Sequence, residues 1–222
     1  MTTRKTIGIL ISGRGSNMSA LIEAARAPDY PARIGLVISN KATAAGLERA
    51  RAAGIETRVI DHKGFTSREA FDDAVHAALV AAGVELVALA GFMRIQSAGF
   101  VDRWMGRQLN IHPSLLPSFK GLHPHKQALD AGVRIAGATV HLVTHELDGG
   151  PIVAQAAVPV LDGDTVEALE RRILAIEHRL YPQAVRLVAS GALGMSGNRV
   201  LCGVGITPAG ENSSLFSPPA GI

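Results

Sequence analysis

The sequence predicts an α/β fold: a doubly wound, mostly parallel sheet with an antiparallel element in the C-terminal half. Short, continuously apolar runs alternate with helical segments through the first half of the chain. Strands that are apolar on both faces are typical of parallel sheets covered by helices on both sides. In the second half, two further apolar runs are joined by the turn-forming residues 148–151, Asp-Gly-Gly-Pro. That linker favours a hairpin-like connection and therefore a mixed sheet.

Four strands and three helices are expected in the first half. The strands are the apolar runs at residues 7–11, 34–39, 57–60 and 86–90. The first helix covers residues 17–27, with Ser16 or Asn17 as its N-cap. The second helix covers residues 44–53 and stops at Gly54, and the third runs from a capping box at residues 66–69 to about Gly83.

The second half is expected to begin with a strand at residues 109–112 and a loop to about Gly121. The elements expected after it are a short helix near residues 126–131, strands at residues 138–143 and 152–160, and a long helix to about Ser190. A second capping box at residues 164–167 opens the long helix, and Pro182 is expected to kink or break it. Glycine, proline and serine dominate residues 194–222, so a weakly ordered C-terminal extension is expected there.

The length of 222 residues fits one large domain or, less often, two small ones, and the apolar fraction of 47% is enough for a full core. The net charge is only +3 and no cluster of Lys and Arg stands out, so the charge says little about nucleic acid, although scattered Arg and Lys could attract a phosphorylated small molecule. No nucleic-acid partner is expected. Cys202 is the single cysteine, which excludes a disulfide within the chain and favours a reducing compartment. The apolar run near the N-terminus is too short for a signal-peptide core or a membrane span. A cytoplasmic protein without membrane contact is therefore expected.

Residues 12–17, Ser-Gly-Arg-Gly-Ser-Asn, lie between the first predicted strand and the first helix. Glycines let the backbone approach a ligand closely, and the free N–H groups at a helix start attract anions. The segment lacks the third glycine of the dinucleotide fingerprint and the Gly-Lys-Ser/Thr of a nucleoside-triphosphate loop. A phosphate monoester therefore fits better than a pyrophosphate. An ordinary glycine-rich turn is the alternative interpretation.

Asn110 and His112 lie two residues apart on a predicted strand, so both side chains are expected on the same side. An amide can polarise a carbonyl, and an imidazole can move protons near neutral pH. Asp148, before two glycines, could reach the same site and stabilise the imidazolium. Since no serine or cysteine nucleophile is evidently paired with this group, direct transfer between two bound substrates is simpler than a covalent route. A structural histidine and a turn aspartate are the alternatives.

His123 and His125, which flank a proline, could suggest a metal site. Two histidines with no cysteine and no clear set of carboxylates are a weak metal signal. No metal is therefore expected.

Together these motifs resemble the folate-dependent phosphoribosylglycinamide formyltransferases, also called glycinamide ribonucleotide transformylases. Residues 110–117, Asn-Ile-His-Pro-Ser-Leu-Leu-Pro, mark the wider group of enzymes that use formyltetrahydrofolate. The Gly-Ser-Asn loop at residues 15–17 narrows the resemblance to the glycinamide ribonucleotide branch. The similarity extends from about Ile7 to Leu193 and includes residues 11–17, 39–41, 46–50, 89–95, 121–123, 146–151, 177–178 and 181–182.

The resemblance implies a Rossmann-like fold and the transfer of a formyl group from 10-formyltetrahydrofolate, a co-substrate, to the amine of glycinamide ribonucleotide in purine biosynthesis. It implies that Asn110 and His112 polarise the formyl group and that Asp148 supports protonated His112 and relays the proton. The ribonucleotide is expected to contact Gly15, Ser16, Asn17 and Glu177. The folate is expected to contact Arg68, Met93, Arg94, Ile95, Gln96, Asn110, Thr144, His145, Glu146, Leu147 and Asp148. His145 and Gln96 depart from the family pattern, which often carries an acidic and an apolar residue there.

The resemblance further implies one domain at residues 1–193, with a phosphate-binding half at about 1–105 and a folate-binding, catalytic half at about 106–193. Small-molecule substrates, no required metal and a monomer or homodimer are expected. A methionyl-tRNA formyltransferase would need a further nucleic-acid-binding domain, which the short tail cannot supply. A formyltetrahydrofolate hydrolase would be expected to carry an N-terminal regulatory domain, whereas the first strand begins near residue 7. A non-catalytic ligand sensor has little use for the proton relay of Asn110, His112 and Asp148.

Overall fold

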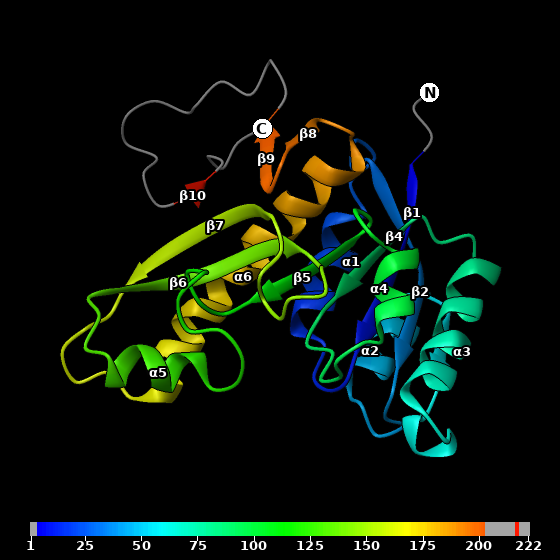
Figure 1. Cartoon of the computed structure of the whole chain (residues 1–222), viewed down its shortest axis with the longest axis horizontal. Coiled ribbons are helices and arrows are strands. Elements are labelled where there is room, and N and C mark those ends of the chain that lie inside the picture. Colours follow the sequence, from blue (N-terminus) through cyan, green and yellow to red (C-terminus); the bar gives the residue numbers. More distant parts are fainter. Residues whose placement is uncertain (1–3, 203–215, 218–222) are drawn as a thin grey trace. The chain divides into compact units, whose positions relative to one another are not determined.

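A computed structural model describes residues 4–202 and 216–217 of the chain (Figure 1). The chain forms two compact units, Met1–Asn110 and Ile111–Ile222. The boundary falls inside strand β5 (Gln108–His112), which therefore contributes residues to both units.

The first unit is a parallel sheet with the strand order β3-β2-β1-β4-β5. All four pairings within it are parallel, and β1 lies between β2 and β4. The strands before β5 are β1 (Lys5–Ile11), β2 (Ala32–Ser39), β3 (Thr57–Val59) and β4 (Leu86–Leu89). Isoleucine, valine and leucine dominate β1, β2 and β4, and these strands are almost wholly buried. Such burial on both faces is the reason that their sequences read as continuous apolar runs.

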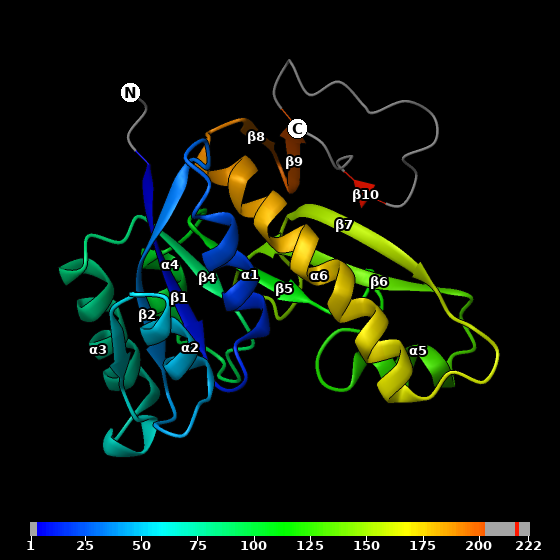
Figure 2. The same cartoon turned by 180° about the vertical axis from the view of Figure 1, so that it is seen from behind.

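Helices cover both faces of this parallel sheet. Figures 1 and 2 show α1 and α2 on one face and α3 and α4 on the other. Their bounds are α1 (Ser16–Ala24), α2 (Gly46–Ala52), α3 (Arg68–Ala81) and α4 (Ala98–Arg103), with a short 3₁₀ helix, η1 (His62–Gly64), before α3. The doubly wound arrangement expected from the sequence is thereby confirmed for this unit.

The second unit is built around an antiparallel pair, β6 (Ile135–Leu142) and β7 (Ile152–Pro159). β6 lies between β5 and β7, and a short strand, β10 (Phe216–Ser217), pairs with β7. The long helix α6 (Val166–Ala189) lies across β6 and β7 (Figure 2), and α5 (Pro124–Asp130) precedes β6. The antiparallel element expected in the C-terminal half is therefore confirmed.

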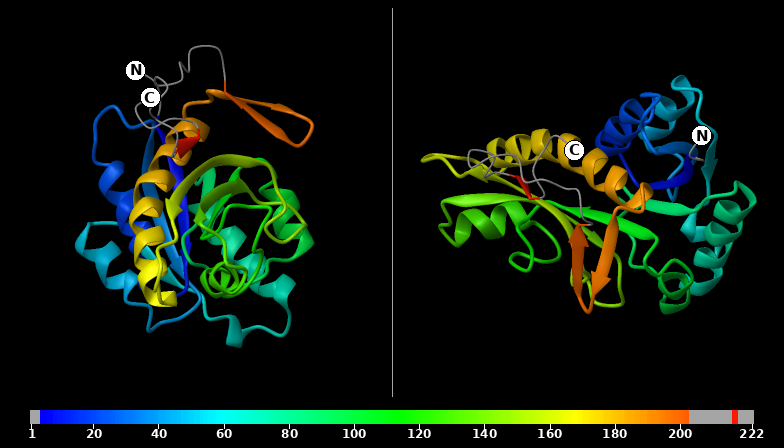
Figure 3. Two further views of the ribbon diagram at one scale, coloured as in Figure 1. Left: turned by 90° about the vertical axis from the view of Figure 1, so that its left-hand side faces the viewer. Right: turned by 90° about the horizontal axis from the view of Figure 1, so that it is seen from above.

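A hairpin follows α6, made of β8 (Leu193–Ser196) and β9 (Arg199–Cys202), as Figure 3 shows. The fading apolar pattern after Gly194 did not predict these strands. The rest of the expected C-terminal extension, apart from β10, lies outside the described residues.

Some local predictions were wrong, and each has a physical reason. Both capping boxes are displaced by one residue, because Ser67 accepts from the Ala70 N–H and Thr165 accepts from the Ala168 N–H. The N-cap of α1 is Gly15 in a left-handed conformation, in place of Ser16 or Asn17. Pro182 does not break α6, which continues to Ala189. Burial of the α6 face that carries Tyr181 and Val185 offsets the hydrogen bond that a proline removes from a helix.

No helix in the described part of the chain is long and apolar enough to cross a membrane.

Candidate active site

The turn between β6 and β7 places a carboxylate in a buried position. Asp148 adopts φ +50°, a left-handed conformation that aspartate tolerates better than most side chains. Gly150 has no room for a side chain, since a Cβ atom there would lie 1.8 Å from the carbonyl oxygen of Leu142. The turn is tight enough that only 8% of Asp148 remains exposed.

Two histidines and a backbone N–H surround this carboxylate. The Oδ2 atom of Asp148 lies 3.5 Å from Nδ1 of His112 and accepts a hydrogen bond from the Gly121 N–H at 2.9 Å. Its Oδ1 atom lies 3.7 Å from Nε2 of His141. Burial alone would raise the pKa of Asp148, but the bonds from His141 and Gly121 and the charges of both histidines outweigh burial and lower that pKa. Asp148 is therefore ionised near neutral pH.

His112 is oriented for proton donation. Its Nε2 atom lies 2.9 Å from the carbonyl oxygen of Phe119, and a carbonyl can only accept. Nδ1 faces Asp148, which is also an acceptor. Both ring nitrogens face acceptors, so the arrangement is fully satisfied by the imidazolium, which carries a proton on each nitrogen. The buried pair of His112 and Asp148 can thus hold a proton and deliver it.

Asn110 lies two residues before His112 on β5, where it is paired with Leu89 of β4. Strand geometry directs residues i and i+2 to the same side. An amide donor therefore accompanies the imidazole along one side of the strand.

The segment between β1 and α1 has the features of an anion site. Gly15 adopts φ +70°, and a Cβ atom there would lie 2.9 Å from Cα of Gly46. The N-cap residue of α1 is Gly15, and no side-chain cap hydrogen bond is formed there. Ser16 and Asn17 begin the first turn of this helix, and Asn17 is buried. Free N–H groups at a helix start are suited to a phosphate.

Ser12 joins the loop at residues 12–17 to the segment after β4. Its N–H donates to the Gly91 carbonyl at 3.1 Å, and its hydroxyl accepts from the Met93 N–H at 2.9 Å. The same hydroxyl donates to Oδ1 of Asn40 at 2.6 Å. One serine therefore fixes the start of residues 93–96 against the loop at residues 12–17.

The side chains of residues 93–96 alternate between exposed apolar and packed polar groups. Met93 and Ile95 are 70% and 64% exposed. Arg94 lies 5.6 Å above the Phe71 ring, and Gln96 accepts a hydrogen bond from Gln108. Exposed apolar side chains held on a fixed backbone are suited to contact a flat, apolar ligand.

Asp72 supports the end of this segment, since it accepts from the Ser97 N–H at 2.6 Å. Burial raises the pKa of Asp72, against the opposing effect of its bonds to Ser97 and the charges of Arg68 and Arg94. Arg68 itself is exposed at the start of α3.

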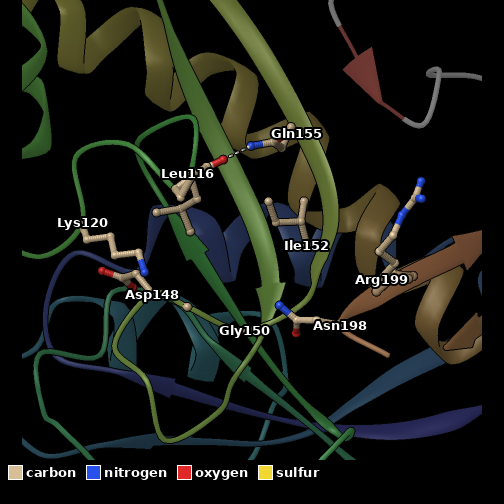
Figure 4. Close-up of a pocket in the computed structure, with 11 residues that line it drawn as sticks. Leu116, Lys120, Asp148, Gly150, Ile152, Gln155, Asn198 and Arg199 are labelled. Carbon is tan, nitrogen blue, oxygen red and sulfur yellow. Dashed lines mark hydrogen bonds between the residues drawn. The ribbon is translucent and has the colours of Figure 1, made fainter. Parts of the chain in front are cut away.

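The other predicted contact residues belong to the second unit. Thr144, His145, Glu146 and Leu147 form the loop before Asp148, and Leu147 is 57% exposed. Glu146 forms an ion pair with Lys120 at 2.6 Å. Glu177 is buried in α6, with 5% of its surface exposed. Asp148 also lines a cavity of about 440 Å³ with Lys120, Gly150, Gln155 and Arg199 (Figure 4).

The histidines weighed as metal ligands lie at the start of α5. His123 is exposed, and His125 is partly buried, which lowers the pKa of its imidazole. Among the described residues there is no group of three or more His, Cys, Asp or Glu side chains that could hold a metal ion.

The formyl transferase family model matches residues 5–185. The chain belongs to the formyl transferase family. The phosphoribosylglycinamide formyltransferase of Escherichia coli K12 is 47% identical to this chain over 192 residues. The match covers 86% of this chain and 91% of that protein. The trifunctional purine biosynthetic protein adenosine-3 of Bos taurus is 53% identical over 198 residues. The chain spans only 20% of the length of that trifunctional protein.

Solved structures of the family share the fold. Glycinamide ribonucleotide transformylase 1 from Symbiobacterium toebii superposes with a TM-score of 0.88 at 52% identity and covers 90% of this chain and 94% of its own. Phosphoribosylglycinamide formyltransferase from Brucella melitensis superposes with a TM-score of 0.82 at 56% identity. The match covers 88% of this chain and 100% of that chain. The fold and the family resemblance expected from the sequence are therefore confirmed.

Some residues that shape this family member's site did not stand out in its sequence. His141 lies inside the apolar run of β6. The one signal that could have identified it as a site residue is that it is the single ionisable residue in this buried strand. Ser12 and Asn40 directly follow strands β1 and β2, a position where polar side chains of parallel sheets often meet. Thr139 holds the loop after β5, because its hydroxyl accepts from the Leu116 N–H at 3.0 Å and donates to the Ser114 carbonyl at 2.7 Å.

Proposed function

We propose that this chain transfers the formyl group of 10-formyltetrahydrofolate to the amine of glycinamide ribonucleotide, giving formylglycinamide ribonucleotide and tetrahydrofolate in de novo purine biosynthesis. Family membership and the names of the relatives support this activity. The observation that carries the mechanism is the buried His112–Asp148 pair, whose geometry suits a proton donor.

The reaction is a direct displacement in which the chain supplies proton transfer and charge stabilisation. 10-Formyltetrahydrofolate supplies the formyl carbon when it is bound, and the amine of the ribonucleotide attacks that carbon. Asn110 donates a hydrogen bond to the formyl oxygen as negative charge develops there. His112 donates a proton to the same oxygen, and Asp148 stabilises the imidazolium until then. The proton lost by the attacking amine passes through Asp148 and His112 to the departing nitrogen of tetrahydrofolate. As the bond between the formyl carbon and that nitrogen breaks, the hydroxyl proton of the intermediate returns to His112, so the enzyme ends unchanged.

The two substrates bind to different surfaces, one made of backbone N–H groups and one made of exposed apolar side chains. Gly15, Ser16 and Asn17 hold the phosphate of the ribonucleotide, and Glu177 contacts the rest of it. Arg68, residues 93–96 and residues 144–148 hold the folate, and the exposed faces of Met93, Ile95 and Leu147 support an apolar contact. Residues 1–193 act as one formyltransferase domain.

The proposal includes no metal, because a carbonyl that receives a proton and a hydrogen bond needs no Lewis acid. Small molecules are the proposed substrates of a cytoplasmic monomer or homodimer. Neither nucleic acid nor membrane takes part.

The proposal is tested by incubating the purified chain with 10-formyltetrahydrofolate and either glycinamide ribonucleotide or buffer alone. The ribonucleotide should be formylated, and formate release in buffer should be much slower. Fast hydrolysis with an unformylated ribonucleotide would make water the acceptor and refute the assignment. Binding of both compounds without turnover would make the chain a sensor.

A further inference from the structure

We propose that His141 is a positioning residue that pairs with Asp148 as an imidazolium and holds this carboxylate ionised and aimed at His112 throughout formyl transfer. This inference rests on the proposed function and extends it to a residue outside the pair that donates the proton. It makes Asp148 the centre of a His–Asp–His arrangement, in which His112 faces one carboxylate oxygen and His141 faces the other.

The hydrogen-bond partners of His141 determine where its protons lie. Nδ1 lies 3.0 Å from the carbonyl oxygen of Leu142, so this nitrogen carries a proton. Nε2 faces Oδ1 of Asp148 at 3.7 Å. In the neutral ring with a proton on Nδ1, the lone pair of Nε2 would face the carboxylate, which is repulsive. The imidazolium removes that repulsion and forms an ion pair with Asp148.

Burial makes this ion pair strong. His141 is 2% exposed, and its neighbours in β6 are apolar. An ionised carboxylate that is buried without a cation is costly, and charges interact more strongly away from water. Hydrogen bonding and charge from His141 both lower the pKa of Asp148 and thus favour its ionised form.

The two carboxylate oxygens have separate partners, which fixes the orientation of the group. Oδ1 faces His141, while Oδ2 faces His112 and the Gly121 N–H. A register shift between β6 and β7 falls next to His141, between Val140 and His141. Such irregularities commonly redirect a side chain near an active site.

The role of His141 follows from what happens when His112 releases its proton. At that moment Asp148 loses the charge of its nearer cation. His141 still neutralises the carboxylate, so Asp148 remains an acceptor for the next proton. The other charged groups around this cluster are engaged elsewhere or act on His112: Lys120 is paired with Glu146, and His125 and Glu170 interact with each other.

Two isosteric variants separate charge from hydrogen bonding. In His141→Asn the amide nitrogen takes the place of Nδ1, so the bond to Leu142 is kept and the group facing Asp148 is lost. In His141→Gln the amide nitrogen takes the place of Nε2, so a neutral donor faces Asp148. Both variants lack the positive charge.

We expect the acidic limb of the kcat–pH profile to move to higher pH in both variants, because burial then raises the pKa of Asp148 with less to oppose it. At neutral pH kcat should fall by about tenfold in His141→Asn and by less in His141→Gln. KM for both substrates should stay near the wild-type value. A purely structural role predicts the opposite order, with His141→Asn close to wild type, and an unmoved acidic limb. Either result would overturn the proposal.

A measurement without turnover separates this inference from the proposed function. The carboxyl carbon of Asp148 can be followed by ¹³C NMR against pH in the wild-type chain and in folded His141→Gln. The pH midpoint of the titration of Asp148 should be higher in the variant than in the wild-type chain, whichever substrate the enzyme uses. An unchanged midpoint refutes the role of His141, whereas failure of the wild-type chain to transfer formyl refutes the proposed function alone.

Discussion

The loop at residues 12–17 of the first unit and the Asp148 turn of the second unit present different kinds of chemical group. The loop at residues 12–17 presents backbone N–H groups, and its tightest point, Gly15, has no room for a Cβ atom. The Asp148 turn presents side chains, and its groups come from β5, the loop after it, β6 and the turn itself. A backbone site is sensitive to added atoms, whereas a side-chain site is sensitive to lost charge. Substitutions in the two regions should therefore fail in different ways.

The largest effect is expected for Asp148→Asn. The amide keeps the shape of the turn but removes the negative charge beside His112, so kcat should fall by roughly 10²–10⁴-fold. Binding of the ribonucleotide, measured by calorimetry, should be unchanged. Asp162→Asn is the control, since it removes a surface carboxylate of the same unit that is paired with exposed Arg134 and lies outside the proposed site. Near-wild-type turnover by Asp148→Asn would contradict the assigned role.

Gly15→Ala should act on binding and stability. A left-handed backbone and a Cβ atom 2.9 Å from Gly46 together cost about 2–4 kcal/mol in the free energy of unfolding. KM for the ribonucleotide should rise far more than KM for the folate. Gly13→Ala is the control, because a Cβ atom there meets nothing within 4 Å. Equal changes in the two KM values would argue against a phosphate loop.

Ser12→Ala tests whether the loop and residues 93–96 are mechanically linked. The substitution leaves the Met93 N–H and Oδ1 of Asn40 without the serine hydroxyl, at a cost of about 1–3 kcal/mol in urea unfolding. Both KM values should rise together, unlike those of Gly15→Ala. Ser190→Ala removes a comparable hydroxyl at the end of α6 and should leave both KM values alone. A change in one KM only would show that Ser12 serves a single substrate.

The smallest effect is expected for Arg172→Gln. This substitution removes an ion pair of the second unit that lies outside the Asp148 turn. Arg172 binds both oxygens of Asp164, at 2.6 and 2.8 Å, and lowers the pKa of that carboxyl from 3.8 to about 2. A lowered pKa stabilises the fold above pH 3.8 and loses that contribution as pH falls towards 2. The Tm of the variant should therefore lie below wild type at pH 6 and converge with it near pH 2. A constant difference across this range would exclude the ion pair as its cause.

The sequence revealed local features well, because strands and helices leave periodic patterns in adjacent residues. The runs around Ile9, Leu36 and Val87 marked buried strands, and the hairpin-like linker at Asp148 marked the antiparallel pair. Gly15 and Asn17 were recognisable because backbone turns and helix starts are encoded within a few residues. The helix caps were predicted less accurately, because moving a helix start by one residue hardly changes the apolar periodicity of the sequence.

Contacts between distant segments were not recognisable from the sequence. Asp148 was identified, but His141 was not, because a histidine within an apolar strand gives no sign of its partner. The same holds for Ser12 and Asn40, whose hydrogen bond joins two strand ends 28 residues apart. The hairpin of β8 and β9 was missed because its strands are short and largely exposed, so they carry no apolar periodicity.

Strand β5 limits the ways in which this chain can be cut. Asn110 is the last residue of one compact unit, and His112 is the second residue of the next. Their spacing is set by two steps of an extended strand, about 6.6 Å along its axis. A split enzyme or a circular permutant opened between the two units would sever the amide from the imidazole, although that point is the natural boundary by compactness. New termini belong in surface loops such as the one near Gly163, where the catalytic strand stays intact.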